Sequence, residues 1–344
     1  MSFEVNSYDE QMMREALMEG AKGIGLTAPN PSVGAVIVRK GKIIGRGYHT
    51  AAGKPHAEVE AVANARAKGE EVSGCEIFIT LEPCSTTGRT PPCTSLIEKA
   101  GIKRVVWAAD DPNPAHLGAA RKLLESKGIE VVSGVLSKEA EWLHRAFFHV
   151  QQTGLPWVLV KTAMSLDGRI TRPPEEGQWL TGEEARADVQ KIRGEADAII
   201  TGGVTARRDN PRLNYRGERS EKSQPLRVVI SYQEKAGLSG EAYLLSDGQE
   251  TRFLKGDLEE ILRELAKEGF QMILVEAGGN LVGEFLDRGL VNEWVSYFAP
   301  MVTGGPNVGV GGEGIESIEK KLCLENTIYQ QIGEDVKLRG IVKK

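Results

Sequence analysis

One histidine, one glutamate and two cysteines in the first half of this sequence have the types and spacing of a catalytic metal site. His56 and Glu58 lie in the segment Pro-His-Ala-Glu, Cys84 follows in Glu-Pro-Cys, and Cys93 follows in Pro-Pro-Cys. A neutral imidazole and two thiolates suit tetrahedral zinc, and three protein ligands leave a fourth position for water. We therefore predict that His56, Cys84 and Cys93 bind zinc at an open, catalytic site.

Glu58 lies two residues after His56, where a helix is expected to begin, and we predict that it carries protons and does not bind the metal. The order H-x-E…P-C is typical of zinc-dependent nucleobase deaminases. In those enzymes the metal lowers the pKa of a water to about 7, and the glutamate passes a proton to the departing amine. The cysteine spacing departs from that pattern, because eight residues separate Cys84 from Cys93 where the signature has two. The intervening loop, with residues 88–90, is expected to contact substrate.

The length and composition of the chain limit the kinds of fold that could position these residues. The chain has 344 residues, of which 40% are hydrophobic and 26% charged, and its formal net charge is −5. This length exceeds what one compact domain usually holds, so two domains are predicted. The negative charge argues against a nucleic-acid partner, no apolar run approaches the ~20 residues of a membrane span, and four cysteines are too few for a disulfide scaffold. We expect a cytoplasmic protein that acts on a small molecule.

Strand-like and helix-like segments alternate in the first half, which predicts an α/β fold with a mostly parallel sheet covered on both faces. Strands are expected at 33–39, 43–45, 76–81, 104–108 and 129–132, and helices at 9–20, 56–68, 94–100 and 119–127. The pattern breaks near 151–156, so we predict one domain over 1–150 and a second over 151–344.

The second half predicts another α/β sheet. Strands are expected at 157–162, 198–201, 226–231, 272–276 and 293–299, and helices at 184–193, 257–268 and 281–288. Thr181 followed by Glu184 has the spacing of a capping box. Two strands run into a glycine pair before a helix, at Gly202-Gly203 and Gly278-Gly279. This is typical of a phosphate cradle, although a tight turn has the same pattern.

A further glycine pattern, G-x-G-x-x-G over 309–314, matches the dinucleotide fingerprint. Only 30 residues follow it, which leaves little room for the next strand and its acidic ribose ligand. We predict a flexible loop here.

Taken together, the motifs of the first half resemble the bifunctional riboflavin-biosynthesis deaminase–reductase family. The resemblance rests on Ala-Pro-Asn-Pro at 28–31, Pro-His-Ala-Glu-Val at 55–59, Leu-Glu-Pro-Cys-Ser and Gly-Arg-Thr-Pro-Pro-Cys within 81–93, and Asp-Pro-Asn-Pro at 111–114. It implies a zinc-containing, cytidine-deaminase-like first domain in which Asn30 binds the pyrimidine. The family commonly carries histidine directly after Cys-Ser, where this chain has Thr86.

The second half resembles the reductase part of the same family, a dihydrofolate-reductase-like α/β domain that uses NADPH. The cofactor positions that the resemblance implies are Ala163, Trp179, Thr205, Asp209, Gly278, Gly279, Asn280, Leu281, Val282, Gly283 and Glu284. The substrate positions that it implies are Gly177, Arg193, Leu213, Arg216 and Glu276. Arg193 and Arg216 suit a phosphate group as planar donors. Lys161 either polarises the substrate or is an exposed lysine at a strand end.

The resemblance implies two consecutive reactions in one chain. The first is zinc-dependent hydrolytic deamination of a diaminopyrimidinone that carries a ribosylamino phosphate, and the second is reduction of the ribosyl chain to ribityl by NADPH. One zinc ion per chain and a homo-oligomer are also expected. Two alternatives stay open: a deaminase of free or tRNA bases with an inactive second domain, and a non-catalytic zinc-stabilised binding module. The open ligand set and Glu58 argue against the second of these.

Overall fold

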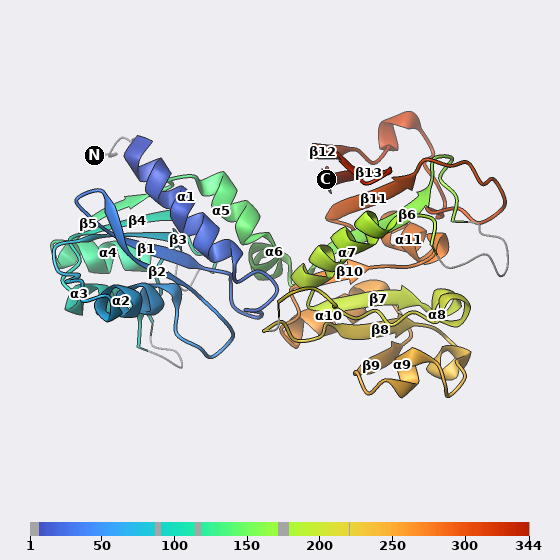
Figure 1. Cartoon of the computed structure of the whole chain (residues 1–344), viewed down its shortest axis with the longest axis horizontal. Helices are drawn as coiled ribbons and strands as arrows, with labels where there is room; N and C mark the ends of the chain where they lie inside the picture. The colour runs from blue at the N-terminus through green and yellow to red at the C-terminus, as the bar shows by residue number, and fades with distance from the viewer. Residues whose placement is uncertain (1–6, 87–90, 114–117, 171–178, 220, 344) are drawn as a thin grey trace. The chain divides into compact units, whose positions relative to one another are not determined.

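The computed structural model describes residues 7–86, 91–113, 118–170, 179–219 and 221–343. The chain forms two compact units, Met1–Gly154 and Leu155–Lys344, and Figure 1 shows the elements of each. The boundary lies at Gly154, which has a φ of 71° and ends helix α6 (Arg145–Thr153). A glycine in this left-handed conformation is a common helix terminator. Among the described residues, every helix is too short or too polar to cross a lipid bilayer.

The first unit is built on a five-stranded sheet. Its strands are β1 (Gly34–Arg39), β2 (Lys42–Tyr48), β3 (Glu76–Leu81), β4 (Arg104–Ala109) and β5 (Glu130–Ser133). Their order is β2-β1-β3-β4-β5, with β3, β4 and β5 parallel and β1 antiparallel to both of its neighbours. The sheet is therefore mixed and not mostly parallel, because the β1–β2 hairpin adds two antiparallel pairings.

Helices cover both faces of this sheet. They are α1 (Ser7–Ala21), α2 (Ala57–Ala67), α3 (Cys93–Lys99), α4 (Ala119–Ser126), α5 (Ser137–Leu143) and α6. Ala35 and Ile37 of β1 belong to the core cluster that includes α2, α3 and α4, whereas Val36 and Val38 belong to the cluster with α1 and α5. This period of two is expected for a strand that is buried on both faces. The first four helices were predicted from the sequence, whereas α5 and α6, which are short, were not.

The second unit contains an eight-stranded sheet. Its strands are β6 (Trp157–Ser165), β7 (Ala198–Gly202), β8 (Leu226–Ile230), β9 (Thr251–Leu254), β10 (Met272–Val275), β11 (Glu293–Ala299), β12 (Leu324–Ile332) and β13 (Asp335–Val342). The order is β12-β13-β11-β6-β10-β7-β8-β9, and only the pairings of β13 are antiparallel. The chain runs outward from β7 to β9 and then returns to place β10 beside β6. In open α/β sheets, ligands bind beyond the carboxyl ends of the strands at such a reversal.

The helices of the second unit are α7 (Glu183–Glu195), α8 (Gly203–Asp209), α9 (Tyr243–Ser246), α10 (Leu258–Lys267) and α11 (Gly279–Asp287). Leucines of α10 and Phe285 of α11 pack against the sheet in one core cluster. The predicted capping box at α7 is wrong, because the N-cap is Gly182 and no side chain caps it. Instead, the Gly182 N–H donates to Asp335 Oδ2 of β13 at 2.8 Å, a long-range partner that local spacing does not reveal. Strands β9, β12 and β13 and helices α8 and α9 were not predicted.

The glycine-rich segment 309–314 is a loop, and it packs closely against α11. A Cβ atom on Gly283 would lie 2.2 Å from the nitrogen of Gly312. The N–H of Gly311 donates to the carbonyl of Gly279 at 2.9 Å. The glycines of α11 therefore let the loop backbone approach the helix, which a side chain would prevent.

Candidate active sites

The three predicted zinc ligands meet beyond the carboxyl end of β3, the central strand of the first sheet. His56 is the N-cap of α2, Cys84 follows β3, and Cys93 begins α3. His56 Nδ1 lies 3.7 Å from Cys84 Sγ and 3.3 Å from Cys93 Sγ, and all three ligand atoms lie within 4.8 Å of one another. A tetrahedral zinc ion, with its usual bond lengths, separates such ligand atoms by about 3.5–3.8 Å. The three side chains therefore fit one zinc ion.

Without a cation, the site favours one thiolate, Cys84, and one neutral thiol, Cys93. A hydrogen bond from Cys93 lowers the pKa of Cys84 to about 4, and the contact with His56 adds to this effect against the opposing influence of burial. The same hydrogen bond and burial raise the pKa of Cys93. A cation between the sulfurs would favour ionisation of both, so the donor set has the chemistry of a thiolate metal site.

Glu58 is the second residue of α2, and only 3% of it is exposed. Burial raises its pKa, and the charge of Cys84 raises it further. A raised pKa makes the carboxyl a stronger proton acceptor than an exposed glutamate. Its burial beside the ligand set and the direction of its pKa shift are compatible with the predicted proton carrier.

Glu82, which the sequence analysis did not single out, ties the zinc-ligand segment to the loop after β4. Its buried carboxylate accepts hydrogen bonds from the backbone N–H groups of Asp111 at 3.3 Å, Gly118 at 3.1 Å and Ala120 at 3.2 Å. Because Glu82 lies two residues before Cys84, these bonds hold the loop and the ligand segment together. The sequence feature that could have pointed to Glu82 is its place in the Leu-Glu-Pro-Cys motif that contains the ligand Cys84.

Asn30, the implied pyrimidine ligand, contacts a histidine that the sequence analysis overlooked. Asn30 Nδ2 lies 3.0 Å from Nε2 of His49, which is 2% exposed. The His49 ring lies 5.5 Å from the ring of His56, with the two planes at 81°. Burial lowers the pKa of His49, which favours the neutral form of its ring. No short motif marks this residue in the sequence.

Three charged residues from distant parts of the chain meet at the carboxyl edge of the second sheet. Lys161 lies on β6, Arg193 on α7, and Glu276 directly after β10. Arg193 donates from Nε and Nη2 to the Glu276 carboxylate at 2.6 and 3.1 Å, and Lys161 Nζ lies 3.6 Å from Glu276 Oε2. The Lys161 side chain is only 15% exposed, so it is not a solvated lysine at a strand end.

The charges at this edge are unbalanced. Burial opposes ionisation of Glu276, but Arg193 and Lys161 outweigh it and lower the pKa of Glu276 to about 2. Burial lowers the pKa of Lys161, and burial together with Arg193 and Arg212 lowers the pKa of Arg216. Several cations therefore surround one carboxylate, which suits a site that binds a phosphate.

Two of the implied cofactor positions contact each other where the helices that follow β7 and β10 begin. Thr205 Oγ1 of α8 accepts a hydrogen bond from the N–H of Gly278, the N-cap of α11, at 3.0 Å. Trp179 is 60% exposed, and the Arg186 guanidinium lies 5.6 Å from its ring centroid. Gly279 and Gly283 pack against the loop 309–314, so that face of α11 is not open to a cofactor.

The remaining implied positions are placed as follows: Ala163 lies on β6, Asp209 ends α8, residues 280–282 and 284 lie on α11, and Leu213 is buried with a φ of 46°. Gly177 and the predicted loop contacts at 88–90 lie outside the described residues.

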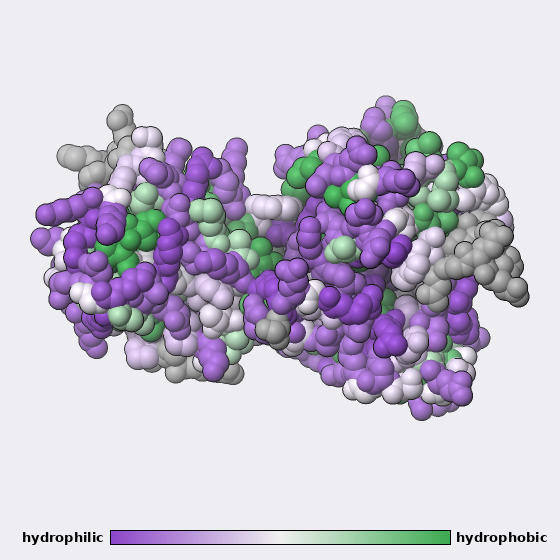
Figure 2. Space-filling view, viewed as in Figure 1, coloured by the Kyte–Doolittle hydropathy of each residue, from purple (hydrophilic) through white to green (hydrophobic). Residues whose placement is uncertain are grey.

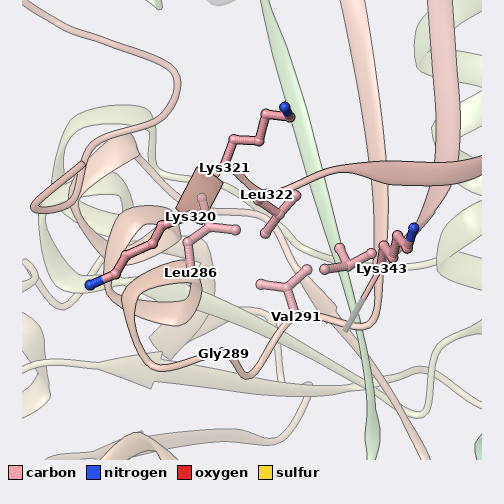
Figure 3. A pocket seen from close by; sticks show the side chains of 8 residues that line it. Leu286, Gly289, Val291, Lys320, Lys321, Leu322 and Lys343 are labelled. Carbon is pink, nitrogen blue, oxygen red and sulfur yellow. The ribbon is translucent and has the colours of Figure 1, made fainter. Parts of the chain in front are cut away.

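A pocket of about 250 Å³ lies in another part of the second unit. It is lined by Leu286, Gly289, Val291, Lys320, Lys321, Leu322, Val342 and Lys343. In Figure 3 the labelled lysine side chains point away from one another and do not converge on the space between the apolar residues. None of the predicted site residues lines this pocket, so we assign it no part in the chemistry.

Comparison with known proteins identifies the family. Residues 6–109 match the family described as cytidine and deoxycytidylate deaminase zinc-binding region, and residues 156–338 match the RibD C-terminal domain. The riboflavin biosynthesis protein RibD of Bacillus amyloliquefaciens is 38% identical, over 97% of this chain and 96% of that protein. The chain belongs to the RibD family. RibD of Escherichia coli is 36% identical, over 95% of this chain and 98% of its own length.

Solved RibD structures have the same fold. Acinetobacter baumannii RibD has a TM-score of 0.87 and 34% identity, covering 98% of this chain and 99% of that one. A Thermotoga maritima structure has a TM-score of 0.85 and 32% identity over 97% and 99%. That protein is a diaminohydroxyphosphoribosylaminopyrimidine deaminase/5-amino-6-(5-phosphoribosylamino)uracil reductase. The family resemblance stated from the sequence and the predicted α/β fold class are confirmed.

Proposed function

We propose that this RibD family member is a bifunctional enzyme of riboflavin biosynthesis, a hydrolase in its first unit and an oxidoreductase in its second. The observation that carries the proposal is the presence of two chemically different sites in one chain. One is the three-ligand metal site beside the buried Glu58, and the other is the cationic site around Glu276. The substrate of the first reaction is a diaminopyrimidinone with a ribosylamino phosphate.

In the first unit, His56, Cys84 and Cys93 would hold one zinc ion per chain. When bound, zinc supplies Lewis acidity, which lowers the pKa of a water at its open position. Asn30 binds the pyrimidine ring. Glu58 takes a proton from the attacking water and delivers it to the amine, which leaves as ammonia.

In the second unit, NADPH when bound supplies the hydride that converts the ribosyl chain to ribityl. Arg193 already donates from two nitrogens to Glu276, so it orients that carboxylate. Arg216 is then the arginine with more donors free for the substrate phosphate. Lys161 polarises the group that accepts the hydride, because its lowered pKa lets it give up a proton readily.

Incubation of the purified protein with the diaminopyrimidinone phosphate, zinc and NADPH tests both halves. Mass spectrometry should show the deaminated and reduced product, and the absorbance of NADPH should fall. Glu58→Gln should slow deamination by about 10²–10⁴-fold with zinc still bound, while reduction of supplied intermediate continues. Glu98→Gln, at an exposed residue of α3 that pairs with Lys127, is the control. Deamination that survives in Glu58→Gln refutes the role of Glu58. Wild-type protein that binds zinc and does not deaminate the substrate refutes the deaminase assignment, and supplied intermediate that leaves NADPH unoxidised refutes the reductase assignment.

We also propose that the chain forms a homo-oligomer through the β12–β13 hairpin. Ile328 and Tyr329 of the edge strand β12 are 60% and 71% exposed, and Val336 of β13 is 45% exposed. Figure 2 shows hydrophobic side chains in the region where Figure 1 places this hairpin. An exposed apolar edge strand is a pairing hazard unless another chain covers it. Light scattering should give a mass above one chain for the protein and a lower mass for Tyr329→Lys.

We place the enzyme in the cytoplasm. All four cysteines are free, and the ligand role of Cys84 and Cys93 requires that they stay reduced. Reducing compartments maintain such thiols.

A further inference from the structure

The backbone of Asn30 is held rigidly beside the first site. Its N–H donates to the carbonyl of Thr27 at 2.8 Å, and its own carbonyl accepts from Thr27 Oγ1 at 3.0 Å. The carboxamide of Asn30 can still rotate by 180° about its last side-chain bond, which would exchange its donor and acceptor ends. The backbone bonds therefore place Asn30 but do not decide which end of the carboxamide meets a ligand.

The hydrogen bond at the second ring nitrogen of His49 fixes which end of the Asn30 carboxamide faces His49. His49 Nδ1 lies 3.0 Å from the carbonyl oxygen of Pro55, and a carbonyl can only accept a hydrogen bond. Nδ1 therefore carries the ring proton, and in the neutral ring Nε2 has only its lone pair. Because Nε2 accepts, the Asn30 atom at 3.0 Å must be the donor Nδ2, and Oδ1 is left as the acceptor.

This chain of hydrogen bonds ends beside the metal ligands. Pro55 directly precedes His56, and the ring of His49 packs edge to face against the ring of His56. His49 follows β2, whose position is set by the sheet, and it is almost fully buried. The orientation of the Asn30 carboxamide is thus tied to the segment that carries the first zinc ligand.

We propose that His49 is a positioning residue of the deaminase. It accepts the hydrogen bond from Asn30 Nδ2 and so leaves Asn30 Oδ1 as the acceptor for the substrate. The ligand that fits this arrangement is a pyrimidine with an N–H or amino group facing Asn30. A ring with only acceptors on that edge would place two lone pairs against each other. The inference rests on the proposed deaminase function and adds a determinant of its specificity.

Two substitutions of His49 separate the two hydrogen bonds. The side-chain oxygen of His49→Gln can replace the Nε2 acceptor, whereas the shorter side chain of His49→Asn can reach Pro55 but not Asn30. We expect His49→Asn to raise the KM for the diaminopyrimidinone phosphate about tenfold, the cost of one lost hydrogen bond, with a much smaller change in kcat. His49→Gln should restore most of the KM. Zinc content and the reductase rate verify that both variants are folded.

A double-mutant cycle completes the test. In an Asn30→Ala background, His49→Asn should raise the KM no further, because the group that it positions is gone. Equal KM values for wild type and His49→Asn, or additive effects in the cycle, overturn the role of His49 while the deaminase assignment stands. Wild-type protein that binds zinc and does not deaminate the substrate overturns the proposed function, and this inference with it.

Discussion

Arg193 holds Glu276 through two hydrogen bonds, 2.6 and 3.1 Å long, across a sequence separation of 83 residues. Arg193 lies on α7, and Glu276 follows β10 at the point where the strand order reverses. Lys161 approaches the same carboxylate from β6. One buried carboxylate therefore compensates two cations, and the charge balance of the reductase site depends on it.

Glu276→Gln should damage the second unit and spare the first. Gln keeps the shape of the side chain but leaves Arg193 and Lys161 without a counter-charge, and breaking a buried pair costs about 3–5 kcal/mol. We expect the second unit to unfold at lower denaturant and the reductase rate to fall, with the deaminase rate unchanged. Glu268→Gln is the matched control, because its pair with Arg252 is largely solvated and worth at most about 1 kcal/mol. Equal effects of the two substitutions would contradict the assignment.

Removal of the metal should separate the two activities. A chelator, or Cys93→Ser, should lower the deaminase rate by more than about 100-fold. Loss of a residue that only hydrogen-bonds to a metal ligand already costs about 10–100-fold, and loss of the ligand itself should cost more. The reductase rate should stay within the error of the assay. Zinc content by atomic absorption and both rates are measured on the same sample. Cys75→Ser, at a buried cysteine outside the ligand set, is the control and should keep its zinc.

His144 should make the first unit less stable in acid. It is 2% exposed, its Nε2 lies 3.1 Å from Thr80 Oγ1, and burial lowers its pKa from 6.5 to about 4. Between these values the unfolded chain binds more protons than the folded one, so stability falls as the pH drops. The expected loss is about 2 kcal/mol between pH 7.5 and pH 5. Hydrogen exchange of the β3 amides reports it, and His144→Gln should show a loss smaller by that amount. An equal loss in His144→Gln would rule out this origin.

Gly283→Ala should loosen the loop 309–314. Alanine inside a helix is ordinarily better than glycine by about 1 kcal/mol, but here its Cβ would lie 2.2 Å from Gly312 N, and such overpacking costs about 1–3 kcal/mol. We expect a lower Tm for the second unit and faster proteolysis within the loop. At Gly240 no atom lies within 4 Å of an added Cβ, so Gly240→Ala is the control, with a change within about 0.5 kcal/mol. A Gly283→Ala protein as stable as this control would disprove the close packing.

Much of the zinc site could be predicted because its information is local. His56 and Glu58 share one turn at the start of a helix, and Cys84 and Cys93 lie in short strings whose residue types have few other uses together. The strands between them were also recognisable, since buried strands are continuous apolar runs. The α5 and α6 helices and the β12–β13 hairpin escaped prediction, because short helices and an exposed strand lack a clear hydrophobic period.

The sequence by itself thus determined the family and the two α/β halves and predicted the zinc ligand set, because residue types, short spacings and apolar periods carry that information. Only the tertiary structure decided which groups touch across long separations. Three contacts are of this kind: the hydrogen bond from Asn30 to His49, the hydrogen bonds from the loop after β4 to Glu82, and the ion pair of Arg193 with Glu276. Each depends on strand order and register, which bring together side chains that no local pattern connects.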